Sequence, residues 1–146
     1  MADVAKGKDV IAFFVPGIPA PGGSKRHVGN GILIDAAKNN KPWRSMVGEY
    51  AHKAMDGKAP SREPLSVITT FVMPRPKGHY RKDGTLRPNA DKHHTKRPDA
   101  LKLMRSTEDA MTGIVWADDS QVAEHLIRKE YGDTPGARIA VTEIKP

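Results

Sequence analysis

The sequence RPDALKLMRSTEDAMTGIVWADDSQV, residues 97–122, carries the most informative pattern in this chain. Pro98 precedes Asp99, a residue type that caps helices, and Gly113 is a typical helix terminator. The pattern therefore predicts a helix over residues 99–112. Five carboxylates lie between the start of that helix and the turn after it, namely Asp99, Glu108, Asp109, Asp118 and Asp119.

The segments on either side of this stretch predict an α+β fold in one domain, residues 1–146. A second helix is expected over residues 41–55, where apolar residues recur at helical spacing. The predicted strands are short apolar runs bounded by proline or glycine, at residues 10–15, 32–34, 65–73, 114–116, 122–130 and 137–144. We expect a mixed β-sheet of about four to six strands with two main helices, and Trp43 and Trp116 in its core.

The segment immediately before residue 99 is strongly basic. Residues 74–98 show no apolar periodicity, so they predict a long loop, which in a compact domain is usually functional or disordered. Only Asp83 and Asp91 oppose its cations. The eight cations are Arg75, Lys77, Arg81, Lys82, Arg87, Lys92, Lys96 and Arg97.

The composition favours a partner that is a polyanion. The 146 residues contain 24 Lys and Arg against 17 Asp and Glu, a net charge of +7. A small basic chain with few aromatic residues is typical of nucleic-acid binding. There is no cysteine, which excludes disulfides, thiolate zinc sites and cysteine nucleophiles. No apolar run approaches the length of a membrane span. We expect a cytoplasmic protein with no membrane partner.

The acidic stretch and the basic loop have complementary chemistry. Carboxylate oxygens are the ligands preferred by Mg²⁺ and Mn²⁺, and a bound metal can activate water for hydrolysis. Lysine and arginine hold phosphates. Any one of the acids could simply face solvent, but together with the basic loop they favour the cutting of a nucleic acid.

Two sequence blocks resemble the RusA family of Holliday-junction resolvases. That family carries Pro-Asp-x-Asp-Asn-Leu-x-Lys-x-x-x-Asp-Ala-Leu-x-Gly followed by Asp-Asp-x-Gln-Val. Residues 95–122 carry the resemblance, which extends loosely to Ser24-Lys25-Arg26 and to Lys41-Pro42-Trp43-Arg44. The resemblance implies a Mg²⁺-dependent, homodimeric endonuclease that acts on four-way DNA junctions and needs no small-molecule cofactor.

The resemblance assigns candidate catalytic residues position by position. Asp99 matches the first catalytic aspartate of the family. Asp119 matches the essential second residue of the Asp-Asp pair, and Asp118 matches its neighbour. These three aspartates are the implied metal ligands. Arg105 stands where the family has a lysine, and Lys102 replaces an asparagine and could supply part of that positive charge.

One position departs from the family pattern. Leu101 stands where the second aspartate of the Asp-x-Asp motif belongs, and leucine cannot bind a metal. Glu108 lies seven residues later on the same helix face, about 10 Å along the axis. Glu108 could bind the metal from another direction, or it could pair with Arg105. The departure also leaves open a protein that binds branched DNA without cutting it.

The candidate DNA contacts lie in the basic loop and in the turn near residue 25. The adjacent pair His93-His94 is expected to meet the DNA backbone, because neighbouring histidines in extended chain point apart and make a poor metal site. A generic RNA-binding protein would explain the charge but not the acidic cluster. The predicted contacts are Lys25, Arg26, Arg75, Lys77, Arg81, Lys82, Lys92, His94, Lys96 and Arg97.

Overall fold

The computed structural model describes residues 8–22, 25–27, 33–35 and 40–145. In chain order the elements are β1 (Asp9–Pro16), β2 (Lys25–His27), β3 (Leu33–Asp35), α1 (Asn40–Met55), β4 (Leu65–Pro74), the 3-10 helix η1 (Lys77–His79), α2 (Ala100–Met111), the 3-10 helix η2 (Asp119–Gln121), β5 (Val122–Gly132) and β6 (Gly136–Glu143). Four strands form a sheet in the order β1-β6-β4-β5, and β2 pairs with β3 in a separate hairpin. Within the four-stranded sheet β4 and β5 run parallel, while the other neighbours are antiparallel. The predicted α+β class, mixed sheet and two main helices are confirmed.

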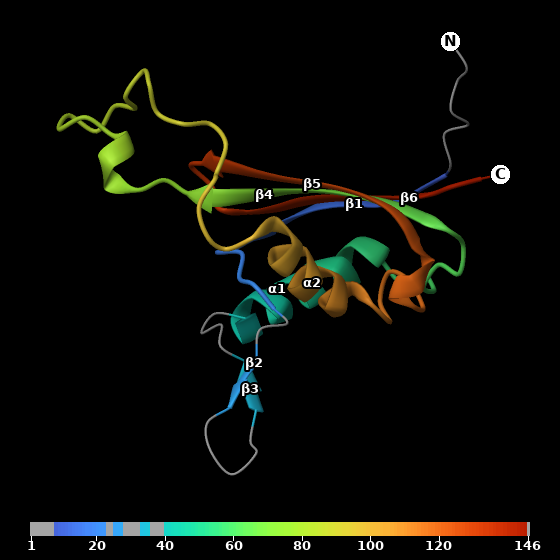
Figure 1. Ribbon diagram of the computed structural model, residues 1–146. Helices are drawn as coiled ribbons and strands as arrows, with labels where there is room; N and C mark the ends of the chain where they lie inside the picture. The colour runs from blue at the N-terminus through green and yellow to red at the C-terminus, as the bar shows by residue number, and fades with distance from the viewer. Residues whose placement is uncertain (1–7, 23–24, 28–32, 36–39, 146) are drawn as a thin grey trace.

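Both helices lie on one face of the four-stranded sheet (Figure 1). Their buried residues recur three or four positions apart, which gives each helix one apolar side against the sheet. These residues include Trp43, Val47, Ala51 and Met55 in α1, and Leu103, Thr107 and Met111 in α2. Trp43 and Trp116 are 2% and 0% exposed, so their predicted core positions are confirmed. Trp43 Nε1 also donates a hydrogen bond to Thr107 Oγ1 at 3.0 Å, which ties the two helices together.

The predicted strand at residues 114–116 is wrong. These residues form a tight turn in which the amides of Ile114 and Val115 both donate to the carbonyl of Met111. Gly113, at φ +88°, ends α2 in a left-handed conformation that favours glycine. Val115 and Trp116 are fully buried. The apolar run therefore fills the core below the helix end instead of extending the sheet.

The β2–β3 hairpin overlaps the predicted strand at residues 32–34 by two residues. Leu33 pairs with His27, and Asp35 with Lys25. Ile32 and Ser24 lie outside the described residues. No helix in the described part of the chain is long and apolar enough to cross a membrane.

The segment between β4 and α2 is a long loop, as predicted, with η1 as its only helical turn among these residues. It projects beyond the end of the sheet (Figure 1). Its return limb is held against the exposed edge of β5. The amide of Tyr131 donates to the carbonyl of Lys92 at 2.8 Å, and the amide of His94 donates to that of Lys129 at 3.0 Å. These bonds fix the base of the basic loop relative to the sheet.

Candidate active site

A pocket of about 320 Å³ lies between α2 and the inner side of β5. Five of its residues come from one face of the helix, since positions 101, 104, 105, 108 and 109 recur at helical spacing. Residues 125 and 127 of β5 close the other side, because alternate strand residues share a face. The pocket is lined by Leu101, Met104, Arg105, Glu108, Asp109, Asp119, His125 and Ile127.

Glu108 and His125 are in contact across this pocket. Glu108 Oε2 lies 3.0 Å from His125 Nε2, and the two side chains are 17% and 27% exposed. The charged contact of Glu108 is therefore with His125 of β5 and not with Arg105, the pairing that the sequence left open as an alternative to metal binding. Burial raises the pKa of Glu108, and the charges of Asp119 and Asp109 act in the same direction, while His125 opposes them. Three carboxylates thus crowd one small pocket.

The turn that carries the two aspartates separates their roles. Asp118 is the N-cap of η2: its carboxylate accepts a hydrogen bond from the amide of Ser120 at 2.9 Å, and its own amide donates to Gln121 Oε1 at 2.8 Å. The hydrogen bonds from Ser120 lower the pKa of Asp118. Gln121 Nε2 in turn donates to the carbonyl of Ser61 at 2.9 Å. This cap holds the turn in place, while the adjacent Asp119 lines the pocket.

Asp99 lies at the N-cap of α2, where its side chain makes no capping hydrogen bond. It is exposed and is not among the residues that line the pocket. Its charged neighbour is Lys129 of β5, whose pKa is lowered by burial and raised again, in part, by Asp99. Lys129 Nζ donates to the carbonyls of Lys96 and Pro98 at 2.8 and 2.9 Å. Lys129 therefore ties the end of the basic loop to the start of the helix.

Leu101 is 74% exposed at the edge of the pocket, so it is not a core residue. Arg105 is also exposed and contributes to the pocket wall, one helical turn after Leu101. Lys102 is exposed but does not line the pocket. Of the residues matched to the family, the structure thus brings Asp119, Glu108 and Arg105 together. It places Asp99, Asp118 and Lys102 outside the pocket.

The donor groups of the pocket suit a hard divalent cation. Within residues 8–22, 25–27, 33–35 and 40–145, no three His, Asp or Glu side chains converge as a ready metal cluster. Mg²⁺, however, usually keeps several waters and is held by one or two carboxylates together with substrate phosphates. Glu108 and Asp119 supply two carboxylates, and their mutual repulsion is what a bound cation would relieve. The residues present therefore fit a cation that is shared with the substrate.

Most of the predicted DNA contacts lie on the outside of the basic loop. Six of the predicted contacts in this loop are exposed cations: Lys77, Arg81, Lys82, Lys92, Lys96 and Arg97. Lys25 and Arg26 lie in β2, and their side chains are outside the described part of the structure.

Arg75 and His94 face the protein instead. Arg75 Nη1 donates to the carbonyl of Asp91 at 2.8 Å, and its guanidinium lies 5.6 Å from the Tyr131 ring centre. His94 is 8% exposed and packs edge-on against Tyr131, with ring centres 5.0 Å apart. A buried ring cannot meet a phosphate from this position. The expectation that His94 contacts DNA is therefore not supported, and the residue anchors the loop.

Sequence reasoning missed His125 and Lys129. Both belong to β5, and the period of two places them on the inner face with Ile127 and Tyr131. That alternation was readable from the sequence. What it could not show is that α2 lies across this face, so that residues 108 and 125 meet.

A pocket lined by carboxylates and an exposed basic loop are two features that a metal-dependent nuclease needs. The family model described as Endodeoxyribonuclease RusA matches residues 16–142 of the 146-residue chain. The chain therefore belongs to the RusA family of endodeoxyribonucleases, which confirms the resemblance carried by its two aspartate motifs. No curated protein matches the chain closely enough to supply a named relative.

Proposed function

We propose that this protein is a Mg²⁺-dependent endonuclease that resolves Holliday junctions by hydrolysing phosphodiesters. Family membership supports cleavage of branched DNA. The observation that carries the proposal is the pocket that Glu108, Asp119 and Arg105 line together, in a chain that also carries an exposed basic loop. Two opposed strands of a four-way junction are related by approximate two-fold symmetry, so a homodimer would offer each of them one site. The protein would act in the cytoplasm, where such junctions arise.

In this proposal Glu108 and Asp119 hold the cation, and Mn²⁺ could replace Mg²⁺. The bound cation would lower the pKa of a water and neutralise charge on the phosphate. Arg105, on the same pocket wall, would stabilise the negative charge that develops on the scissile phosphate. The exposed loop cations bind the flanking phosphates and orient the junction arm. No small-molecule cofactor takes part in this scheme.

In this scheme Glu108 supplies the metal-binding carboxylate that the family motif has at the position of Leu101. Its carboxylate is already held toward the pocket by the 3.0 Å contact with His125. His125 is thus a positioning residue. Replacing His125 with glutamine, which retains a hydrogen-bond donor, should weaken Mn²⁺ binding less than replacing it with alanine. Asp99 and Lys102 are candidates for a catalytic role only because they match positions of the family motif. Asp118 would contribute by capping the turn that holds Asp119.

A second candidate is a protein that binds branched DNA without cutting it. The absence of a carboxylate at Leu101 favours this candidate. The basic loop would serve both functions equally, so DNA affinity does not separate them.

A cleavage assay separates the two candidates. A labelled four-way junction is incubated with the protein and Mg²⁺, with linear duplex as the substrate control and with EDTA as the metal control. We expect paired nicks in the junction that require the metal. Asp119→Asn should abolish cleavage while junction binding persists, because removing a negative charge cannot weaken attraction to phosphate. The matched control is Glu49→Gln on α1, an exposed acid outside the pocket. Cleavage by Asp119→Asn at the wild-type rate would refute the site, and binding without nicking by the wild type would favour the second candidate.

A further inference from the structure

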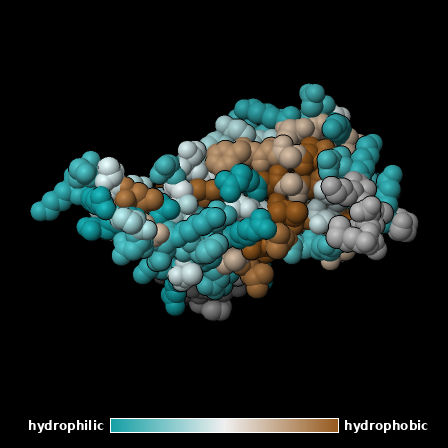
Figure 2. Space-filling model, turned by 90° about the horizontal axis from the view of Figure 1, so that it is seen from above, coloured by the Kyte–Doolittle hydropathy of each residue, from teal (hydrophilic) through white to brown (hydrophobic). Residues whose placement is uncertain are grey.

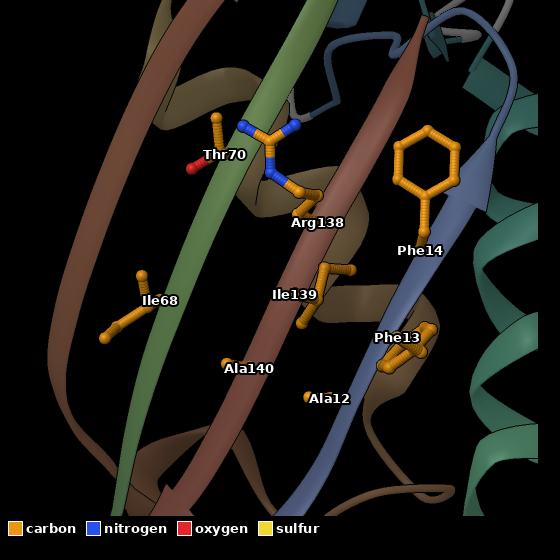
Figure 3. A pocket seen from close by; sticks show the side chains of 8 residues that line it. All are labelled: Ala12, Phe13, Phe14, Ile68, Thr70, Arg138, Ile139 and Ala140. Atoms are coloured by element: carbon orange, nitrogen blue, oxygen red, sulfur yellow. The ribbon is translucent and has the colours of Figure 1, made fainter. Parts of the chain in front are cut away.

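The basic loop carries a single large aliphatic side chain, Leu86, which is 46% exposed. Figure 2 shows a small apolar spot among hydrophilic residues on the projecting end of the molecule. This setting differs from the open face of the sheet, where the register places Ile68 beside Leu126 in an apolar row and a shallow hollow lies over neighbouring strands (Figure 3). Single exposed leucines are common on proteins, so the surroundings of Leu86 decide what it can bind.

The surroundings of Leu86 are strongly positive. Three exposed cations lie within five residues of it in the sequence: Arg81, Lys82 and Arg87. The nearest acid, Asp83, accepts hydrogen bonds from the hydroxyl and the amide of Thr85 at 2.6 and 3.0 Å, and these bonds lower its pKa. A partner of this surface must offer negative charge and apolar surface side by side. DNA does so, because its phosphates flank the faces of its bases.

Leu86 lies in a β-hairpin at the tip of the loop, where it pairs antiparallel with Tyr80. The amides of Arg81 and Arg87 donate to the carbonyls opposite them, on the two sides of this pair, at 2.7 and 2.8 Å. A pair flanked in this way has the shorter Cα separation of the two kinds in an antiparallel ladder, so its side chains lie close together. Tyr80 therefore supports one side of Leu86, while the rest of the leucine stays exposed.

The turn of this hairpin is fixed by its own hydrogen bonds. Gly84 has a φ of +87°, a conformation that favours glycine, and its amide donates to the carbonyl of Arg81 at 2.9 Å. A three-residue turn that ends in such a glycine is a common hairpin connection. The carboxylate of Asp83 adds its two bonds to Thr85. The tip is therefore preorganised before any partner binds.

Two further bonds hold the base of the hairpin. Arg87 Nε donates to the carbonyl of Gly78 at 3.1 Å, and the hydroxyl of Tyr80 donates to Asp133 Oδ1 at 3.4 Å. Asp133 lies in the turn that follows β5, the strand whose residues 125 and 127 close the candidate active site. The hairpin and the pocket are thus both held by one strand.

We propose that this hairpin, residues 79–87, inserts Leu86 between bases at the branch point of the DNA junction, and that this insertion selects branched over linear DNA. Leucine is one of the residues that proteins insert between base steps, which it partly unstacks. Unstacking costs least where bases are already poorly stacked or paired. The strands of a four-way junction change partners at the branch, so the cost of insertion is lowest there. The inference rests on the junction substrate of the proposed function and adds the residue that recognises the branch.

The first test compares the affinities for branched and linear DNA in EDTA, so that no cleavage takes place. A labelled four-way junction and a linear duplex are titrated with the protein by fluorescence anisotropy. The wild type should bind the junction more tightly. Leu86→Ser should weaken junction binding by about tenfold, because one leucine side chain is no longer removed from water. Its duplex affinity and its slope of log affinity against log salt should stay unchanged, since no phosphate contact is lost.

Two control variants separate the apolar contact from the charge. Leu86→Met keeps an apolar side chain of similar size, so it should bind both DNAs as the wild type does. Lys82→Ala removes a charge from the same turn, so it should weaken binding to junction and duplex by the same factor and reduce the salt slope by about one. Circular dichroism establishes that each variant is folded.

The second test observes the branch itself, again in EDTA. The fluorescent adenine analogue 2-aminopurine is placed at the branch point, where it emits more strongly when it is unstacked. The wild type and Leu86→Met should raise its fluorescence on binding, and Leu86→Ser should not.

Equal losses of junction and duplex affinity in Leu86→Ser, or no loss at all, would overturn the inference. A rise in fluorescence that persists in Leu86→Ser would do the same, because another group would then open the branch. Neither test measures cleavage. A protein that opens the branch through Leu86 but never nicks it would therefore count against the proposed endonuclease alone.

Discussion

Replacing Leu101 with aspartate should return a metal ligand to the pocket without harming the fold. Leu101 is the second residue of α2 and is 74% exposed, so little apolar burial is lost. The lower helix propensity of aspartate costs up to about 0.7 kcal/mol. A negative charge in the first turn of a helix contributes roughly 0.3–1 kcal/mol in the opposite direction. The net change in the free energy of unfolding should therefore stay within about 1 kcal/mol, or about 4 °C in Tm.

The gain should be seen in metal binding. The new carboxylate would join Glu108 and Asp119, the two proposed ligands in this pocket, and so offer the cation a third carboxylate ligand. We expect Mn²⁺ to bind roughly tenfold more tightly, by analogy with the 10–100-fold effects of changes around metal sites. Electron paramagnetic resonance of free Mn²⁺ measures this affinity directly. The Mg²⁺ concentration needed for half-maximal junction cleavage should fall in parallel.

Leu86→Asp is the matched control, because it adds the same charge at an exposed leucine outside the pocket. It should leave Mn²⁺ affinity unchanged. Two results would refute the reasoning. A fall in Tm of more than about 10 °C in Leu101→Asp would show that the leucine is buried in the protein as it exists in solution. Equal Mn²⁺ affinity in Leu101→Asp and the wild type would show that this pocket is not where the metal binds.

Three further outcomes follow from the same structure. Glu108→Gln should lower the rate of cleavage by about 100-fold, since it removes a proposed metal ligand. The Tm should change little, because glutamine keeps the shape of the side chain. Unimpaired cleavage in a single-turnover assay would contradict this role. Acidification below about pH 6.5 should loosen the basic loop. Burial and nearby lysines lower the pKa of His94 below its ordinary value of 6.5. The unfolded chain therefore takes up a proton that the folded chain excludes, and the folded loop loses stability as the pH falls. His94→Phe, which retains an aromatic ring beside Tyr131, should reduce this dependence in limited trypsin digestion, and an unchanged pH profile would argue against it. Replacing Lys96 and Arg97 with alanine should reduce the slope of log affinity against log salt by about two, and an unchanged slope in a filter-binding titration would place both residues off the DNA.

Several features of this protein depend on local chemistry and were predictable from the sequence. The bounds of α2 follow from Asp99 and Gly113, and β4 ends at Pro74, as proline cannot donate to the next strand. The loop at residues 75–98 follows from its charge and its lack of apolar periodicity. The wrong prediction of a strand at residues 114–116 also has a physical cause. A short apolar run has the same composition whether it extends a sheet or fills a gap in the core, and only packing decides between them.

The sequence by itself determined the family, the residue types of the site and the basic loop, because motif spacing and charge are properties of the chain. The tertiary structure alone decided which of those residues meet. Glu108 contacts His125 because α2 crosses the inner face of β5, and this crossing also leaves Asp99 beside Lys129 and outside the pocket. The register of four strands likewise aligned Ile68 and Leu126 into a single apolar row. Periodicity shows which residues share a face of a strand, but neighbouring strands and helices determine what lies opposite that face.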